Sequence, residues 1–205
     1  MIFGNYGYID LPAYCGDVEE GVRALLEINR RPKTLSHILD VAEMNVRIAR
    51  MHGLDADICR KAALLHDISA VIKADDMYAY AVENGMQLCE AEERYHFLLH
   101  QRMSEIAARE YFRIDDARIL SPVKCHTTLK ADADEYDMAL FIADKLAWDR
   151  EGVPPFYEDV YSRLNDLPAA CLAYMDYMQD SGELLCPHTD WAAAYTYLCG
   201  IRGRK

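Results

Sequence analysis

The sequence predicts an all-α fold in a single domain, and three observations lead to this prediction. Apolar residues recur at helical spacing in most segments, no convincing run alternates as a β-strand does, and capping residues, Gly or Pro separate the segments. A chain of 205 residues, 52% of them hydrophobic, can bury a full-sized core. We expect residues 1–16 to form an irregular lead-in that packs on the body, and residues 17–205 to form one helical domain.

Capping residues indicate where the first helices begin and end. A Ser, Thr or Asp at the N-cap accepts a hydrogen bond from an N–H of the first turn that otherwise has no partner. Such residues precede four segments: Asp17, with Glu20 as its capping-box partner; Thr34 or Ser36; Asp55; and Asp115 or Asp116. Helix ends are expected before Pro32, at Gly53 and at Asn84-Gly85.

Apolar periodicity predicts the remaining helices. They cover residues 77–82, 103–112, 136–148, about 157–180 and 189–200. The helix that leads to His126 contains Pro122, which should lie in its first part or kink it.

Charge and cysteine content restrict the class of function. The formal net charge of -12 argues against a surface that binds nucleic acid or an anionic membrane, although a metal could still attract a small anion. The seven cysteines are scattered and lack CxxC pairs, which favours a reducing, cytoplasmic environment. No stretch has the ~20 apolar residues of a membrane span, and the first residues lack the basic start of a secretory signal. The oligomeric state stays open between a monomer and a homodimer.

An apolar run that ends in His66-Asp67 is the most informative feature of the chain. Residues 62–65 read Ala-Ala-Leu-Leu, and a charged Asp is costly to bury after such a run without a partner. A divalent metal is the common partner that satisfies both a His and an Asp. The alternative is a helix end at which the pair faces solvent.

Four other residues in helix-like segments extend this pair into a candidate metal site. His37 shares a helical face with apolar residues, His100 and His126 follow apolar or small residues, and Asp144 ends an apolar run. Each histidine taken alone could instead be a satisfied core residue. The candidate metal ligands are His37, His66, Asp67, His100, His126 and Asp144.

Six such ligands are enough for two metals when one carboxylate bridges them. Imidazoles and carboxylates suit iron, manganese, zinc or similar ions. Two metals a few ångströms apart can hold a bridging hydroxide and clamp the oxygens of a phosphoryl group. The set therefore predicts hydrolysis of a phosphoester or phosphoanhydride bond.

The order H…HD…H…H…D resembles the HD-domain metal-dependent phosphohydrolase superfamily. Within it the chain is similar, from about residue 34 to residue 198, to the bacterial symmetrical diadenosine tetraphosphate hydrolases of the YqeK type. The matching pieces are His37, Ala63-Leu64-Leu65-His66-Asp67, Leu98-Leu99-His100, His126-Thr127-Thr128, Ile142-Ala143-Asp144 with Arg150, and Pro187-His188-Thr189. The resemblance implies a helical domain, a dinuclear centre that is most often di-iron, and cleavage of dinucleoside tetraphosphates into two nucleoside diphosphates.

The resemblance also suggests how the residues divide their roles. One metal would be held by His37, His66, Asp67 and Asp144, and the second by His100, His126 and the bridging Asp67. A metal-bridging hydroxide would attack phosphorus. Phosphate contacts are expected first from Lys130 and Arg150, which with Asp67 are the catalytic candidates, and more weakly from Lys73 and Lys33.

The chain departs from the family pattern at basic positions. Residues 68–70 lack the Lys that usually follows the HD pair, and Lys73 is the nearest replacement. Thr34 stands where an Arg is usual, and Leu129-Lys130 replaces a Gly-Arg pair, which keeps the charge but loses the forked grip of Arg on phosphate. Three alternatives follow: hydrolysis of another nucleotide or phosphate ester, a non-catalytic nucleotide-binding sensor, or a structural helical domain with core histidines.

Overall fold

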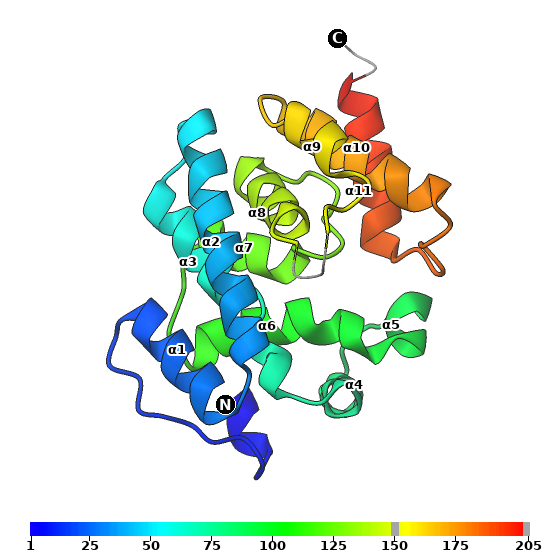
Figure 1. Ribbon diagram of the computed structural model, residues 1–205. Helices are drawn as coiled ribbons and strands as arrows, with labels where there is room; N and C mark the ends of the chain where they lie inside the picture. The colour runs from blue at the N-terminus through cyan, green and yellow to red at the C-terminus, as the bar shows by residue number, and fades with distance from the viewer. Residues whose placement is uncertain (149–151, 203–205) are drawn as a thin grey trace.

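The computed structural model describes residues 1–148 and 152–202, and within them it contains helices and loops but no β-strand (Figure 1). The first half comprises η1 (Ile2–Asn5), α1 (Val18–Ile28), α2 (Pro32–His52), α3 (Ala56–Leu65), η2 (Ile68–Val71), α4 (Ala74–Glu83), α5 (Glu90–Arg94) and η3 (His96–Leu99). The second half comprises α6 (His100–Glu110), α7 (Ala117–Cys125), α8 (Glu135–Leu146), α9 (Tyr157–Ser162), α10 (Leu167–Asp180) and α11 (Thr189–Arg202). The all-α prediction is confirmed.

Three of the expected caps form as the sequence predicts. Asp17 accepts from the N–H of Glu20, Asp55 from Asp57 and Ile58, and Asp116 from Arg118. The expected cap of α2 is wrong. This helix begins at Pro32, ahead of Thr34 and Ser36, because a proline at the first helical position has the required φ and lacks only an N–H that would be unpaired there.

Two further elements differ from the sequence prediction. The helix expected over residues 157–180 is divided into α9 and α10, because Asp166 caps a new helix by accepting from the N–H of Ala169 at 3.1 Å, and Pro168 occupies its first turn. The short helix α5 was not predicted, since its five residues are too few to show a period.

The core is built around α8, which packs against α2, α3, α7, α9 and α10. Its apolar run is fully enclosed: Leu140, Phe141 and Ile142 have no exposed surface. Helix α2 crosses in front of α7 and α8, and α3 packs behind it (Figure 1). This arrangement brings the end of α3, the start of α6 and the end of α8 to one region, where the polar candidates lie.

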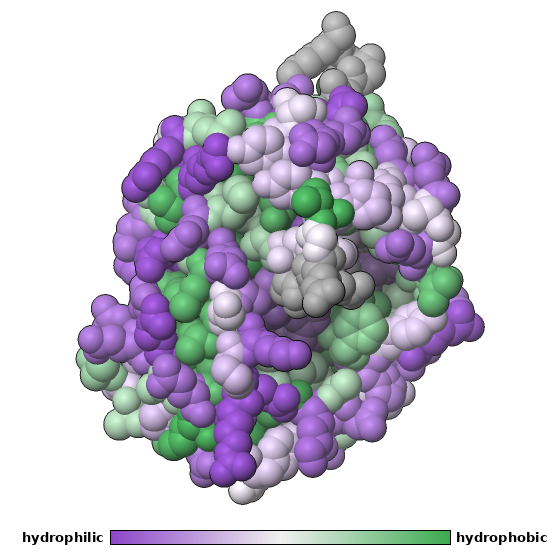
Figure 2. All heavy atoms as spheres, in the orientation of Figure 1, coloured by the Kyte–Doolittle hydropathy of each residue, from purple (hydrophilic) through white to green (hydrophobic). Residues whose placement is uncertain are grey.

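Residues 1–16, predicted as an irregular lead-in, begin with the short helix η1. Ile2 and Phe3 in η1 are buried, and the Phe3 ring meets Tyr111 edge-to-face at 5.8 Å. The described helices include none that is long and apolar enough to cross a membrane. The face drawn in Figure 2 mixes hydrophilic and hydrophobic side chains and is hollowed beside the grey atoms.

Candidate metal centre

His66 and Asp67 lie where α3 ends and η2 begins. His66 is completely buried, and its Nδ1–H donates to the carbonyl of Ala63 at 2.7 Å. Its Nε2 is also buried but has no hydrogen-bond partner, and it faces one oxygen of Asp67 and one of Asp144, each at 3.6 Å. A buried ring nitrogen that faces two carboxylates and makes no hydrogen bond has the surroundings of a metal ligand.

The other two inner histidines are oriented in the same way. The Nδ1–H of His100 donates to the carbonyl of Phe97 at 2.6 Å, and that of His126 donates to Val123 at 2.9 Å. In each case the acceptor lies three residues earlier in the same helical turn. A carbonyl bound to Nδ1 fixes the tautomer and directs the Nε2 lone pair away from it. All three lone pairs therefore point inward.

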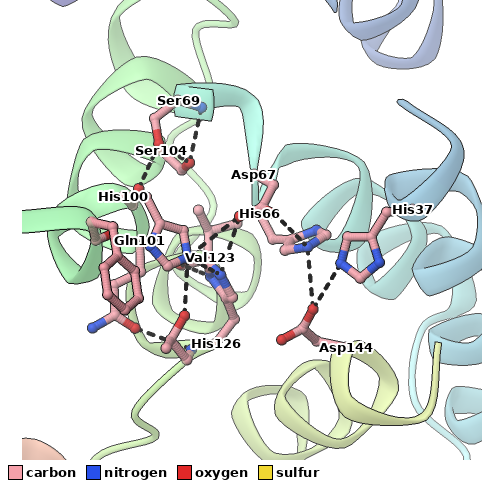
Figure 3. Close-up of polar contacts among 12 residues, drawn as sticks. His37, His66, Asp67, Ser69, His100, Gln101, Ser104, Val123, His126 and Asp144 are labelled. Carbon is pink, nitrogen blue, oxygen red and sulfur yellow. Dashed lines mark hydrogen bonds and ion pairs between the residues drawn. The ribbon is translucent and has the colours of Figure 1, made fainter. Parts of the chain in front are cut away.

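The inward nitrogens of His100 and His126 lie only 2.9 Å apart, and each is 3.4 Å from Oδ1 of Asp67 (Figure 3). Neither nitrogen has a proton to share when Nδ1 carries it, so two acceptors face each other beside a carboxylate. A cation satisfies all three atoms at once.

The remaining two candidates join the centre from distant parts of the chain. His37 extends from α2 and Asp144 from the end of α8, and Nε2 of His37 is 3.0 Å from Oδ1 of Asp144. The structure thus brings all six candidates together (Figure 3). The ligand atoms form two sets, and within each set all atoms lie within 4.8 Å of one another. Asp67 belongs to both sets, with His37 and His66 in one and with His100 and His126 in the other. The donor set of imidazole nitrogens and carboxylate oxygens fits iron, manganese or zinc.

Electrostatics at the centre favour a bound cation. Burial would raise the pKa of Asp67, but the surrounding imidazoles, that of His66 first, hold it well below its usual range. Burial likewise opposes ionisation of Asp144, but Lys145 and the neighbouring imidazoles keep its pKa well below normal. Burial favours neutral His66, yet Asp67 and Asp144 raise its pKa to about 9, so without a metal they attract a proton to Nε2, the place that a metal cation would take. Both carboxylates are therefore anionic and attract positive charge into the site.

Lys145 is a functional candidate that the sequence reasoning missed. It directly follows Asp144, and its Nζ donates to Oδ2 of that carboxylate at 2.5 Å and to the carbonyl of His126 at 3.3 Å. Its ammonium also lies 5.2 Å from the ring centre of Phe141 and 5.8 Å from that of Tyr174. The available signal was a lone Lys next to a candidate ligand at the end of an apolar run.

Hydroxyl and amide groups around His100 were also missed. The Thr127 hydroxyl lies 3.1 Å from Nε2 of His100, and the Thr127 N–H donates to the side-chain oxygen of Gln101 at 3.1 Å. Ser69 donates to the carbonyl of His100 at 2.8 Å and accepts from Ser104 at 2.9 Å (Figure 3). These contacts tie η2 and the turn after α7 to the first turn of α6, and so hold His100 in place.

Of the expected phosphate-binding cations that the structure describes, Lys130 and Lys73 contact groups outside the centre. Lys130 donates to Ser121 and lies 2.9 Å from an oxygen of the fully buried Asp137. It lines a separate cavity of about 790 Å³ whose walls include none of the six candidate ligands. Lys73 lies over the ring of Tyr8 at 4.3 Å, and Lys33 is exposed in the first turn of α2. Arg150 lies outside the described residues.

A third cluster, formed by Cys89, Glu92 and His188, could in principle hold a metal. Nδ1 of His188 accepts from the N–H of Asp190 at 3.1 Å, which leaves the ring proton on Nε2, 3.5 Å from Glu92. Glu92 is also paired with Arg102 at 3.0 Å. The cluster is therefore already charge-balanced without an ion.

Comparison with known proteins finds chains similar to this one. A protein from Lactococcus lactis subsp. cremoris, described as an uncharacterized protein in the pepC 5' region, is 38% identical over 122 residues, which are 59% of this chain and 63% of that protein. Ribonuclease Y from Ureaplasma parvum is 26% identical over 173 residues, 82% of this chain and 31% of that enzyme. The chain thus spans less than two thirds of the length of these curated relatives.

A solved structure and a family model complete the comparison. The crystal structure of a predicted HD superfamily hydrolase involved in NAD metabolism from Clostridium acetobutylicum has a TM-score of 0.80 at 24% identity, with 95% of this chain and 100% of that chain covered. Similarity at this level of identity establishes a shared fold. The family described as HD domain matches residues 34–149, more than half of the chain and all six candidate ligands. This chain belongs to the HD domain family.

Proposed function

We propose that this chain is a metal-dependent phosphohydrolase of nucleotides, and that it cleaves dinucleoside tetraphosphates symmetrically into two nucleoside diphosphates. The position of Asp67 carries the proposal. Its Oδ2 faces His66, while its Oδ1 faces His100 and His126. A carboxylate whose two oxygens face separate sets of imidazoles has the placement of a bridge between two ions.

The chain's own residues hold and orient the site. One ion would take His37, His66, Asp67 and Asp144 as ligands, and the other His100, His126 and Asp67. A divalent metal pair, when bound, supplies positive charge for the phosphoryl oxygens and activates water for hydrolysis. Iron is our first expectation, with manganese and zinc compatible with the same donors. Lys145 holds Oδ2 of Asp144, which leaves Oδ1 directed at the histidines.

The names of the similar proteins define the substrate panel. The HD superfamily hydrolase involved in NAD metabolism suggests NAD as a test substrate, and ribonuclease Y suggests a short RNA. The net charge of -12 argues against RNA, since binding a polyanion depends on excess Lys and Arg. Diadenosine tetraphosphate, ADP, NAD, p-nitrophenyl phosphate and an RNA oligonucleotide therefore form an informative set.

The proposal is tested by metal analysis of the purified protein together with chromatography of the products from this panel. We expect bound transition metal and conversion of diadenosine tetraphosphate to ADP as the only product. AMP with ATP as products would replace the symmetrical reaction with an asymmetrical one. Faster turnover of another compound in the panel would make that compound the substrate. Purified protein without metal would support a structural helical domain whose histidines are core residues.

A non-catalytic nucleotide sensor is the second candidate function. It is favoured by the position of Lys130, which pairs with Asp137 in a cavity separate from the centre. Fewer cations than in the family pattern would then contact a bound polyphosphate at the metal centre, which would favour binding without turnover. Calorimetric binding of diadenosine tetraphosphate with no product after prolonged incubation would identify this function.

A further inference from the structure

A pocket opens beside the metal centre, between η3 and the C-terminal helices α10 and α11. Its volume is about 320 Å³, and its walls are mainly apolar and aromatic. We call it the aromatic pocket and define it by Tyr95, Phe97, Tyr174, Met178, Leu185 and Trp191. A cavity of this size is within the range of small-molecule sites. In Figure 1, α10 and α11 lie across from α5 on the right-hand side of the molecule.

Two polar residues make the aromatic pocket continuous with the metal centre. Thr127 and Lys145 both line it. The Thr127 hydroxyl is 3.1 Å from the inward nitrogen of His100, and Nζ of Lys145 is 2.5 Å from Asp144. A ligand in this pocket would therefore touch groups that contact both sets of candidate metal ligands.

Lys145 has the capacity for one more hydrogen bond. An ammonium carries three N–H donors, and two of them have partners in Asp144 and the carbonyl of His126. The third has no partner among the residues that the structure describes. Because Lys145 lines the aromatic pocket, this N–H can donate to an anion that extends from the pocket to the metal centre.

The rim of the aromatic pocket exposes large apolar side chains. Phe97 is 57% exposed and Leu185 is 72% exposed. Aromatic rings around a cavity favour a flat ring, which stacks on them, over a flexible chain. The Lys145 ammonium at the inner end and the Glu183 carboxylate in the wall also disfavour a purely apolar occupant.

We propose that the aromatic pocket binds the heteroaromatic base of a nucleotide, and that Lys145 contacts the phosphate leading from that base to the metal centre. This base subsite specifies part of the substrate of the proposed function. It rests on that function, because the phosphate is assumed to point toward the metal centre. The base would then be recognised by η3, α10 and α11. The metal ligands come from other elements, namely α2, the end of α3, α6, the end of α7 and α8.

The test compares two ligands that differ only in the base, AMP and ribose 5-phosphate, by calorimetry on the metal-loaded protein. We expect AMP to bind at least about tenfold more tightly than ribose 5-phosphate to the wild type. Phe97→Ala should weaken AMP about tenfold and leave ribose 5-phosphate unchanged. Ile28→Ala, a change at a half-exposed apolar residue of α1, is the matched control and should alter neither ligand.

Leu185→Trp provides a second variant at an exposed position, because the larger side chain should obstruct the mouth of the aromatic pocket and weaken AMP alone. With metal kept at a saturating concentration, Lys145→Met should weaken both ligands by a similar factor, and Lys145→Arg should restore part of the affinity. Equal affinity of the wild type for AMP and ribose 5-phosphate would overturn the base subsite. Unchanged affinity of metal-saturated Lys145→Met for both ligands would show that Lys145 acts only through Asp144 and would overturn its phosphate contact.

These outcomes separate the subsite from the proposed function. Base-dependent binding without hydrolysis of any panel substrate would contradict the phosphohydrolase and retain the subsite. Hydrolysis of diadenosine tetraphosphate with no base-dependent affinity would retain the phosphohydrolase and reject the subsite.

Discussion

His66, His100 and His126 each donate Nδ1–H to the carbonyl three residues earlier, although they belong to three different segments of the chain. The repeated contact directs three Nε2 lone pairs at Asp67 and Asp144. Single residues therefore define the charge and geometry of the centre. The contacts of a single residue also decide whether its substitution should remove metal or only weaken the fold.

Asp67→Ala should be the most damaging change at the centre, because it removes the one carboxylate shared by both sets of ligands. Loss of an outer partner of a ligand alone typically lowers metal affinity 10- to 100-fold, so we expect at least about a hundredfold loss here, with hydrolysis lost as well. Elemental analysis and circular dichroism measure the two effects. Asp40→Ala, an exposed position on α2, is the control. Near-full activity of Asp67→Ala would disprove the chemistry.

Lys130→Ala should affect stability and leave metal content unchanged. Lys130 compensates the charge of buried Asp137, which keeps hydrogen bonds from Ser121 and the N–H of Asp134 when the lysine is lost. Because Lys130 is partly exposed, we expect the free energy of unfolding to fall by only about 1–2 kcal/mol. Urea denaturation measures this, with Lys124→Ala as an exposed control on the same segment. Unchanged stability combined with weaker substrate binding would return Lys130 to the phosphate site predicted from sequence.

At the scale of elements, close packing decides residue choice where local propensity would choose otherwise. Helix α1 contains Gly21, although glycine is about 1 kcal/mol less favourable than alanine inside a helix. A Cβ at this position would lie 2.8 Å from the ring of Tyr14 and 2.9 Å from that of Phe112. Phe112 is buried, so it has little room to move. The lead-in and the end of α6 therefore pack against the bare backbone of α1.

Gly21→Ala should lower the free energy of unfolding by about 1–2 kcal/mol, because overpacking outweighs the gain in helix propensity. Gly200→Ala is the matched control in α11, where nothing lies within 4 Å of the added Cβ. That variant should be more stable by about 0.5 kcal/mol. Thermal and urea unfolding of the two variants give the comparison. A stabilised Gly21→Ala would mean that the two aromatic rings move apart without cost.

At the scale of the whole molecule, a buried carboxylate connects the middle of the chain to its C-terminal part. Glu92 of α5 pairs with Arg102 of α6 and faces His188, which directly precedes α11. Burial would raise the pKa of Glu92, but His188 and Arg102 lower it to about 2. A folded-state pKa below that of the unfolded chain means that the carboxylate stabilises the fold above the unfolded pKa, near 4.5.

This stabilisation should disappear as the pH falls from about 4.5 through 2, because the unfolded chain then binds a proton that the folded chain resists. We expect Glu92→Gln to be less stable than the wild type by roughly 3 kcal/mol at pH 7. The difference should shrink steadily below pH 4.5. Urea unfolding at a series of pH values measures it, with Glu93→Gln, an exposed neighbour, as the control. A difference that is independent of pH would exclude this linkage.

The sequence by itself determined the helical fold and several helix starts, because caps and apolar periodicity act within one or two turns. Asp17, Asp55 and Asp116 begin helices for this reason. It also identified the six candidate ligands, because an acid or imidazole at the end of an apolar run is conspicuous wherever the run lies. Their role as metal ligands stays a prediction. The start of α2 and the break before α10 differ from the prediction, because Pro32 begins a helix ahead of the capping residues and Asp166 interrupts an otherwise continuous apolar period.

Only the tertiary structure decided which side chains meet. His37 and Asp144 are 107 residues apart in sequence yet 3.0 Å apart in space, because α2 packs across α8. The packing of α7 against α8 brings Lys145 to the carbonyl of His126 and Lys130 to Asp137, although both lysines closely follow a candidate ligand in sequence. Spacing along a helix fixes direction only relative to that helix. The position of a long side chain relative to another element depends on how the two elements cross, and no local pattern encodes that angle.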